Sequence, residues 1–213
     1  MFHWSLILVL DRIGLKPINT VLQVEKKSEI TGIILAGGLN LRMGSNKALV
    51  CWRGKYLIDW VYSAICPLCS EIIISANEGD FSHLDAKIVP DRFNRIGPVA
   101  GIEAGLSSSK TDLNIIVSCD TPMLTTGFFR YMIREHEGFE ISIPVHDGTN
   151  EPLIGIYNHS VLSRFQEAIA RGQFKPPSII KSCNYQEVPV GRELNFYTAE
   201  LFLNLNSPED LKQ

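Results

Sequence analysis

The sequence predicts a three-layer α/β fold in which helices cover both faces of a mostly parallel sheet. Two observations lead to this prediction. From residue 30 onward, short apolar runs typical of buried strands alternate with segments that carry apolar residues at helical spacing. Turns rich in Gly, Asn and Asp follow several of these runs, and open α/β sheets bind ligands beyond the carboxyl ends of their strands.

The first strands and the first helix are predicted from their apolar residues. Residues 31–35 form an apolar run that ends at Gly37-Gly38, which indicates a buried strand leading into a turn. Residues 57–65 carry apolar side chains on one side of a helix. Three consecutive isoleucines within 71–76 predict a central strand, and the shorter run at 86–89 predicts another strand that a proline ends.

The alternation continues to the end of the chain. A Gly-Pro pair begins the predicted helix at 99–106, and the apolar run at 113–119 predicts a further buried strand. We also predict a strand at 201–205 and a short final helix, which Ser207 caps and Pro208 begins. Between them, a helix, two strands and another helix are predicted at 127–136, 141–145, 153–157 and 161–170.

The first 29 residues differ from the rest, and we predict a leader at residues 1–29 followed by a single domain at residues 30–213. The apolar run at 4–10 is far shorter than the ~20 residues needed to span a bilayer. A secretory signal needs a basic start, which Met1-Phe2-His3 lacks. The leader is open to three interpretations: an added strand, a poorly ordered extension, or a product of the start-codon assignment. We assign it no function.

Composition and charge exclude several classes of protein. The net charge is −3 and the basic residues form no run, so nothing indicates a nucleic-acid groove. Five cysteines in a chain of this length indicate reduced thiols and a cytosolic location. Cys66-Pro67-Leu68-Cys69 has no second cysteine or histidine pair to complete a zinc site. We therefore interpret it as two ordinary cysteines near a turn, the alternative being a redox pair.

The most informative segment is the turn from Ala36 to Lys47. Its glycines allow a ligand to approach the backbone, whose exposed N–H groups bind anions, and Arg42 and Lys47 are suited to neutralise phosphates. Neither familiar phosphate loop is present, because asparagine precedes Lys47, alanine follows it, and the G-x-G-x-x-G pattern is absent. The segment predicts a phosphate-binding turn, with a glycine-rich turn carrying two surface cations as the alternative.

Two acidic residues follow predicted strands at one edge of the sheet. Asp120 comes directly after the strand at 113–119, where a carboxylate faces the ligand crevice and suits Mg²⁺. Asp91 comes soon after the strand at 86–89 and is suited to accept hydrogen bonds from a nucleotide. For each residue the alternative is a carboxylate that forms or caps a turn. Cys119 lies within an apolar run, which favours a buried, unreactive thiol over a nucleophile.

A series of short motifs resembles the molybdenum cofactor guanylyltransferases. The motifs occur in that family's order over roughly residues 30–213, and together they are far more specific than any one alone. They are Leu35-Ala36-Gly37-Gly38, Arg42-Met43-Gly44 with Lys47, Ile74-Ser75-Ala76-Asn77, Val89-Pro90-Asp91, Gly97-Pro98-Val99-Ala100-Gly101, Cys119-Asp120-Thr121-Pro122, Asn150-Glu151-Pro152-Leu153 and Asn204-Leu205-Asn206-Ser207-Pro208-Glu209.

The resemblance implies a nucleotidyltransferase fold with a Rossmann-like sheet. It also implies a reaction that joins GMP from GTP to the terminal phosphate of molybdopterin and releases pyrophosphate, with Mg²⁺ as the metal and Mn²⁺ as a substitute. The residues it assigns are, for GTP, Leu35, Ala36, Gly37, Lys47, Asn77, Asp91 and Asp120; for the metal, Asp120; and for the cofactor phosphate, Asn206. For catalysis we expect Arg42 and Lys47 to stabilise the charge that develops on the pyrophosphate, together with Asp120 as the metal ligand.

Gly38 favours guanine within this resemblance, because related cytidylyltransferases typically have L-A-A-G at these positions. Asn40 departs from the family, which commonly has serine or a small or basic residue there. The alternatives are a related nucleotidyltransferase that uses CTP or another phosphorylated acceptor, and a non-catalytic nucleotide-binding adaptor in cofactor delivery. The expected partners are GTP, the molybdopterin cofactor and proteins of molybdoenzyme maturation, without nucleic acid or membrane.

Overall fold

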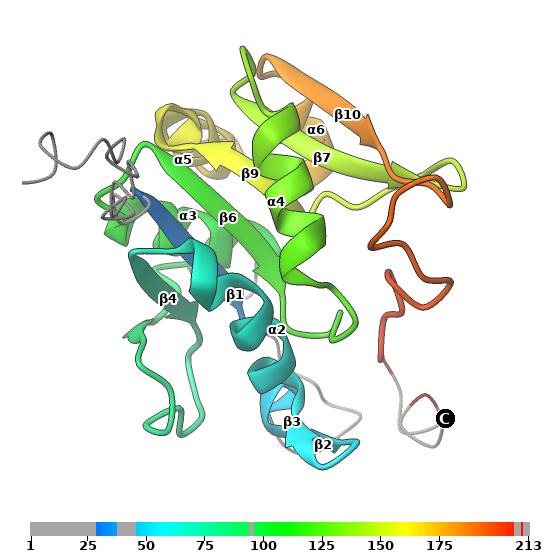
Figure 1. Ribbon diagram of the computed structural model, residues 1–213. Coiled ribbons are helices and arrows are strands. Elements are labelled where there is room, and N and C mark those ends of the chain that lie inside the picture. Colours follow the sequence, from blue (N-terminus) through cyan, green and yellow to red (C-terminus); the bar gives the residue numbers. More distant parts are fainter. Residues whose placement is uncertain (1–28, 38–45, 94–95, 207–209, 211–213) are drawn as a thin grey trace, which may run out of the picture.

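The chain forms one large sheet with helices on both of its faces (Figure 1). Figure 1 shows a computed structural model, which describes residues 29–37, 46–93, 96–206 and 210. Residues 1–28 of the leader, most of the turn before Lys47, and the residues predicted to begin the final helix lie outside the described residues. Within the described ranges, no helix is long and apolar enough to cross a membrane.

Eight strands of the described chain form the main sheet, in the spatial order β10-β7-β9-β6-β1-β4-β5 with β8 paired to β7. Most neighbours along this order are parallel, whereas β9 runs antiparallel to both β6 and β7. The strands are β1 (Ile30–Leu35), β4 (Glu71–Ser75), β5 (Lys87–Val89), β6 (Leu113–Ser118), β7 (Ile141–His146), β8 (Thr149–Asn150), β9 (Ile154–Asn158) and β10 (Tyr185–Pro189). A separate hairpin joins β2 (Cys51–Trp52) to β3 (Lys55–Tyr56).

Helices form the outer two layers, with α2 and α4 on one face of the sheet and α3, α5 and α6 on the other (Figure 1). Successive strand side chains point to opposite faces. Accordingly, Ile34 of β1 belongs to the core with Phe128 of α4, and Ile33 to the core with Phe165 of α5. The helices are α2 (Leu57–Ile65), α3 (Pro98–Ser108), α4 (Thr126–Glu135), α5 (Leu162–Ala170) and α6 (Pro176–Ile180), with short 3-10 turns η2 (Lys47–Leu49), η3 (Cys66–Leu68) and η4 (His159–Val161).

The structure confirms the predicted α/β class and the alternation of strands and helices through residue 170. It adds the hairpin, β8, β10 and α6, which the sequence analysis missed. The two strands of the hairpin and β8 are two residues long, too short for a periodic signal. β10 has the sequence Tyr-Gln-Glu-Val-Pro and lies at the edge of the sheet, where polar residues and proline are tolerated.

The prediction of a strand at 201–205 is wrong. These residues form a turn followed by irregular chain. Their alternating apolar residues resemble a strand, but they pack into two different clusters of side chains. Leu201 joins the large core with α2 and α4, whereas Leu205 packs in a small cluster with Trp52 and Leu57. The segment therefore spans two parts of the domain instead of pairing with the sheet.

Candidate active site

The turns that the sequence singled out lie at one edge of the sheet. Pairing aligns Leu35 of β1 with Ser75 of β4 and with Ser118 of β6, so three strands end level with one another. The backbone ladder continues one residue further, through the hydrogen bonds Ala36 N to Ser75 O (2.9 Å), Ala76 N to Val89 O (3.0 Å) and Cys119 N to Leu35 O (3.2 Å). The chain beyond each strand therefore begins at the same edge.

Three side chains from distant parts of the sequence meet at this edge. The ammonium of Lys47 donates to Oδ2 of Asp120 at 2.7 Å and to Oδ1 of Asn206 at 2.6 Å. The side chains of Lys47 and Asp120 are each 16% exposed, so water screens their attraction only in part. This arrangement brings the predicted phosphate-binding cation, the predicted metal ligand and the predicted cofactor-phosphate residue into direct contact.

Local structure holds Lys47 at this position. Lys47 begins the 3-10 turn η2, and the side chain of Asn46 accepts a hydrogen bond from Ala48 N at 2.9 Å, as a helix-capping residue does. The same Asn46 amide donates to the carbonyl of Glu78 at 2.6 Å. The turn that follows β4 is therefore tied to the end of the glycine-rich turn.

Asn206 reaches the site through its neighbour Leu205. The backbone N–H of Leu205 donates to the carbonyl of Asp120 at 3.0 Å, and its side chain is 2% exposed in the cluster with Trp52 and Leu57. In Figure 1 the C-terminal segment passes the end of the sheet on the same side as the β2–β3 hairpin. A short apolar anchor thus fixes the following polar residue beside Asp120.

Asp120 retains an unused oxygen. Its Oδ1 is buried and has no hydrogen-bond partner among the described residues. An unpaired buried oxygen is costly, so it indicates a position suited to a further donor or a cation. Over the ranges that the structure describes, no group of three or more His, Cys, Asp or Glu residues is arranged to hold a metal ion. The protein thus offers one carboxylate and one amide oxygen, a set compatible with a Mg²⁺ ion that also binds phosphates and water.

A second polar group lies between β4 and β5. Oδ1 of Asp91 accepts from the hydroxyl of Ser75 at 2.9 Å, and Oδ2 accepts from the amide of Asn77 at 3.2 Å. The backbone N–H of Asp91 donates to Oδ1 of Asn77 at 2.9 Å. Gly37 comes close to this carboxylate, because a Cβ built on it would lie 3.4 Å from Oδ2 of Asp91. Asn77, Asp91 and Gly37, which the resemblance assigns to the nucleotide, are therefore neighbours.

Ser75 lies in one of the quoted motifs but was assigned no role from the sequence, although a signal was present. Ser75 is fully buried and directly follows the three isoleucines of β4, and a buried hydroxyl in such a run requires a partner. That partner is Asp91.

Of the other assigned residues, Leu35 and Ala36 are buried at the end of β1, and the N–H of Ala36 donates to the carbonyl of Ser75. Arg42 and Gly38 lie outside the described residues.

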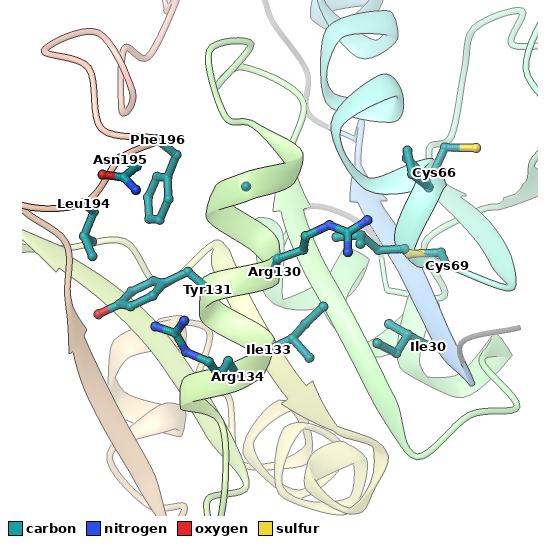
Figure 2. Close-up of a pocket in the computed structure, with 13 residues that line it drawn as sticks. Ile30, Cys66, Cys69, Arg130, Tyr131, Ile133, Arg134, Leu194, Asn195 and Phe196 are labelled. Carbon is teal, nitrogen blue, oxygen red and sulfur yellow. The ribbon is translucent and has the colours of Figure 1, made fainter. Parts of the chain in front are cut away.

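Two of the cysteines have thiols with a strongly raised pKa. Burial raises the pKa of the Cys119 thiol to about 12, which confirms the interpretation of an unreactive thiol. Burial likewise raises the pKa of Cys69 to about 12. Cys66 and Cys69 line a groove of about 1060 Å³. Figure 2 shows that Arg130 of α4, which also lines this groove, points toward them. The groove includes Ile30, the first residue of β1, and none of the assigned site residues line it.

The fold and the motifs match a known family. A family model described as the MobA-like NTP transferase domain matches residues 32–188. The chain belongs to this family. It is 31% identical to a probable molybdenum cofactor guanylyltransferase from Carboxydothermus hydrogenoformans, over 86% of this chain and 94% of that relative. The resemblance drawn from the motifs is therefore confirmed, and the protein is a nucleotidyltransferase.

Solved structures share the same fold. The molybdopterin-guanine dinucleotide biosynthesis protein A from Archaeoglobus fulgidus is similar with a TM-score of 0.72 and 27% identity, covering 86% of this chain and 95% of that chain. The 2-C-methyl-D-erythritol 4-phosphate cytidylyltransferase from Thermus thermophilus has a TM-score of 0.65 at 15% identity, covering 87% and 96%. The second likeness concerns the fold alone. Because a cytidylyltransferase shares the fold, the fold by itself does not select the base.

Proposed function

We propose that the protein transfers GMP from GTP to the terminal phosphate of molybdenum-loaded molybdopterin and releases pyrophosphate. The observation that carries this proposal is the contact of Lys47 with both Asp120 and Asn206 at the end of the sheet. A cation, a carboxylate with a buried unpaired oxygen and an amide oxygen suit the binding of a metal and phosphates. The name of the 31% identical relative supports the choice of substrates.

The nucleotide is proposed to lie along the ends of β1, β4 and β5. A carboxylate offers about four acceptor positions, so Asp91 retains capacity beyond its bonds from Ser75 and Asn77. That capacity suits hydrogen-bond donors of a nucleotide. Gly37 has no side chain to separate a ligand from this carboxylate. Leu35 and Ala36 complete the proposed backbone contacts.

Mg²⁺, with Mn²⁺ as a substitute, is the proposed metal. Asp120 and Asn206 would hold it through oxygen atoms, which are the ligands that this hard cation prefers. When bound, such a metal neutralises negative charge on phosphate oxygens. The buried, unpaired Oδ1 of Asp120 supports the assignment, because a cation would satisfy it.

The proposed reaction is a direct displacement. An oxygen of the acceptor phosphate attacks the α-phosphorus of GTP, the bond to the β-phosphate breaks, and pyrophosphate leaves. The attacking oxygen is anionic at neutral pH, so no side chain needs to remove a proton. Positioning and charge stabilisation therefore provide the catalysis. Lys47 and Arg42 are proposed to stabilise the charge that develops on the pyrophosphate.

The proposal also includes a cytoplasmic location for the protein. It includes transfer of the product to proteins of molybdoenzyme maturation. A CTP-dependent transferase, or one with another phosphorylated acceptor, is the nearest alternative, since the fold is common to several such enzymes. A non-catalytic adaptor is the alternative from a different class, and it would bind GTP without releasing pyrophosphate.

Labelled GTP tests the proposed reaction. The protein is incubated with Mg²⁺, molybdenum-loaded molybdopterin and GTP that carries the label on either the α- or the γ-phosphate. Guanylyl transfer moves the α-label into the pterin product and the γ-label into pyrophosphate. Recovery of the γ-label as free phosphate or on the pterin would contradict the proposal. Retention of both labels in intact GTP would favour the adaptor.

A further inference from the structure

A buried carboxylate lies outside the proposed reaction, in the middle of α3. Glu103 has 0% of its surface exposed. A buried charge is costly unless it is paired and fully hydrogen-bonded. Glu103 meets this condition, because Arg92 donates to both of its oxygens, and Oε1 also accepts from Ser107 at 2.9 Å and from Gln166 at 3.0 Å.

Arg92 directly follows Asp91, the carboxylate proposed to contact the nucleotide. Its side chain is 54% exposed, yet its guanidinium binds a carboxylate with no exposure at all. Nε lies 3.1 Å from Oε2 of Glu103, and Nη2 pairs with Oε1. A planar guanidinium that binds both carboxylate oxygens is held in one orientation. The chain just after Asp91 is therefore tied to α3.

The same helix also passes close to Asp91. A Cβ built on Gly101 of α3 would lie 3.0 Å from the hydroxyl of Ser75 and 3.7 Å from Oδ1 of Asp91. Gly101 and Glu103 are two residues apart on α3. The helix thus approaches Asp91 through Gly101 and holds the following residue through Glu103, while Ser75 and Asn77 hold the carboxylate from β4.

We propose that Glu103 is a positioning residue for the nucleotide site and that, through Arg92, it fixes the backbone that carries Asp91. The inference rests on the proposed function, because it requires Asp91 to contact the nucleotide. Glu103 itself touches no ligand and no reacting atom in this assignment. Its loss is therefore expected to weaken nucleotide binding and to leave the transfer step little changed at saturating nucleotide.

Two substitutions test this role in the full-length protein. Glu103→Gln keeps the shape of the side chain and removes its charge, whereas Arg92→Lys keeps the charge and removes the two-pronged geometry. We expect each to weaken GTP binding about tenfold, the effect of one charge-assisted hydrogen bond, as measured by calorimetry. The rate of pyrophosphate release at saturating GTP should change by less than about twofold. Arg92 is exposed, so its variant remains informative if Glu103→Gln fails to fold.

A double-mutant cycle separates positioning from general stability. In an Asp91→Asn background, Glu103→Gln should have no further effect on GTP affinity if it acts through Asp91. Glu167→Gln in α5, which alters only an exposed pair with Arg171, is the matched control and should bind GTP normally. Normal GTP affinity in both Glu103→Gln and Arg92→Lys, or a full tenfold loss added to Asp91→Asn, would overturn the proposal. Absence of GTP binding by the unaltered protein is a different result, and it would overturn the proposed function as well.

Discussion

The ammonium of Lys47 lies 2.7 Å from Oδ2 of Asp120, although 73 residues separate them along the chain. They meet because β1 and β6 are neighbours in the sheet and end level with one another. The pair joins the glycine-rich turn that follows β1 to the carboxylate that follows β6. Transfer of GMP by the proposed route depends on both partners.

Replacement of Asp120 by alanine is expected to lower the rate of pyrophosphate release by about 10³-fold or more, because it removes the carboxylate proposed to hold the metal. The variant should still fold, since Asp120 is on the rim of the sheet and partly exposed. Asp112→Ala is the matched control, because Asp112 comes before β6 and Asp120 comes after it. Normal transfer by Asp120→Ala would contradict the metal assignment.

Replacement of Lys47 by alanine should lower the transfer rate by about 10²-fold through loss of charge stabilisation in the transition state. Single-turnover measurements with saturating GTP separate this effect from weaker binding. Lys55→Ala is a suitable comparison, because this lysine of the β2–β3 hairpin lies over the ring of Trp60 in α2, outside the assigned site. An unchanged rate for Lys47→Ala would leave Lys47 with a structural role only.

Loss of the anchor formed by Leu205 should lower activity as well as overall stability. Leu205→Ala removes a buried side chain and is expected to cost about 2–3 kcal/mol in the free energy of unfolding. Because Leu205 also bonds to the carbonyl of Asp120 and precedes Asn206, transfer should fall about tenfold or more. Leu201→Ala is the matched control, since Leu201 lies in the same segment but is buried in the large core with α2 and α4. Equal activity losses in two equally destabilised variants would argue against a specific anchor.

Acidification should destabilise the fold through His136. Burial lowers the pKa of His136 below its ordinary value of about 6.5, and its ring nitrogens contact Ser142 and Asn158. The unfolded chain therefore binds a proton at His136 more readily than the folded chain does. The stability that neutral His136 contributes to the fold is complete above about pH 6.5, and it is lost as pH falls through the lower pKa of the folded state. Denaturant unfolding between pH 7.5 and pH 5 should show a smaller loss in His136→Gln than in the unaltered protein. Identical pH profiles would exclude this contribution.

The sequence predicted the central strands well because their signals are local. Strands β1, β4 and β6 are buried on both faces, because helices cover both sides of the sheet. Their sequences therefore contain consecutive isoleucines, which are visible without knowledge of the packing. The orientation of β9 was not predictable in the same way. Its apolar run is the same whether it pairs parallel or antiparallel to β6, and only the connection through β8 reverses the chain. The apolar alternation at 201–205 led to the wrong prediction of a strand for a related reason. Spacing alone does not show whether a segment pairs with the sheet or packs against other side chains.

The sequence predicted those residues of the candidate site that come directly after a strand. Asp91 and Asp120 could be named because parallel strands end at one edge, whatever the details of packing. Glu103 could not be named, because a glutamate within a helix is typical of an exposed face and its burial depends on Arg92 from another element. Asn206 was assigned by resemblance alone, and its contact with Lys47 depends on a tertiary anchor that no local pattern reveals.

Pyrophosphate release with each of the four nucleoside triphosphates tests the central proposal most directly. The reactions contain Mg²⁺ and are run with and without molybdenum-loaded molybdopterin. Guanylyl transfer predicts release with GTP alone among the four, and only when the pterin is present. Release with CTP in preference to GTP, or release from GTP without the pterin at the same rate, would contradict it.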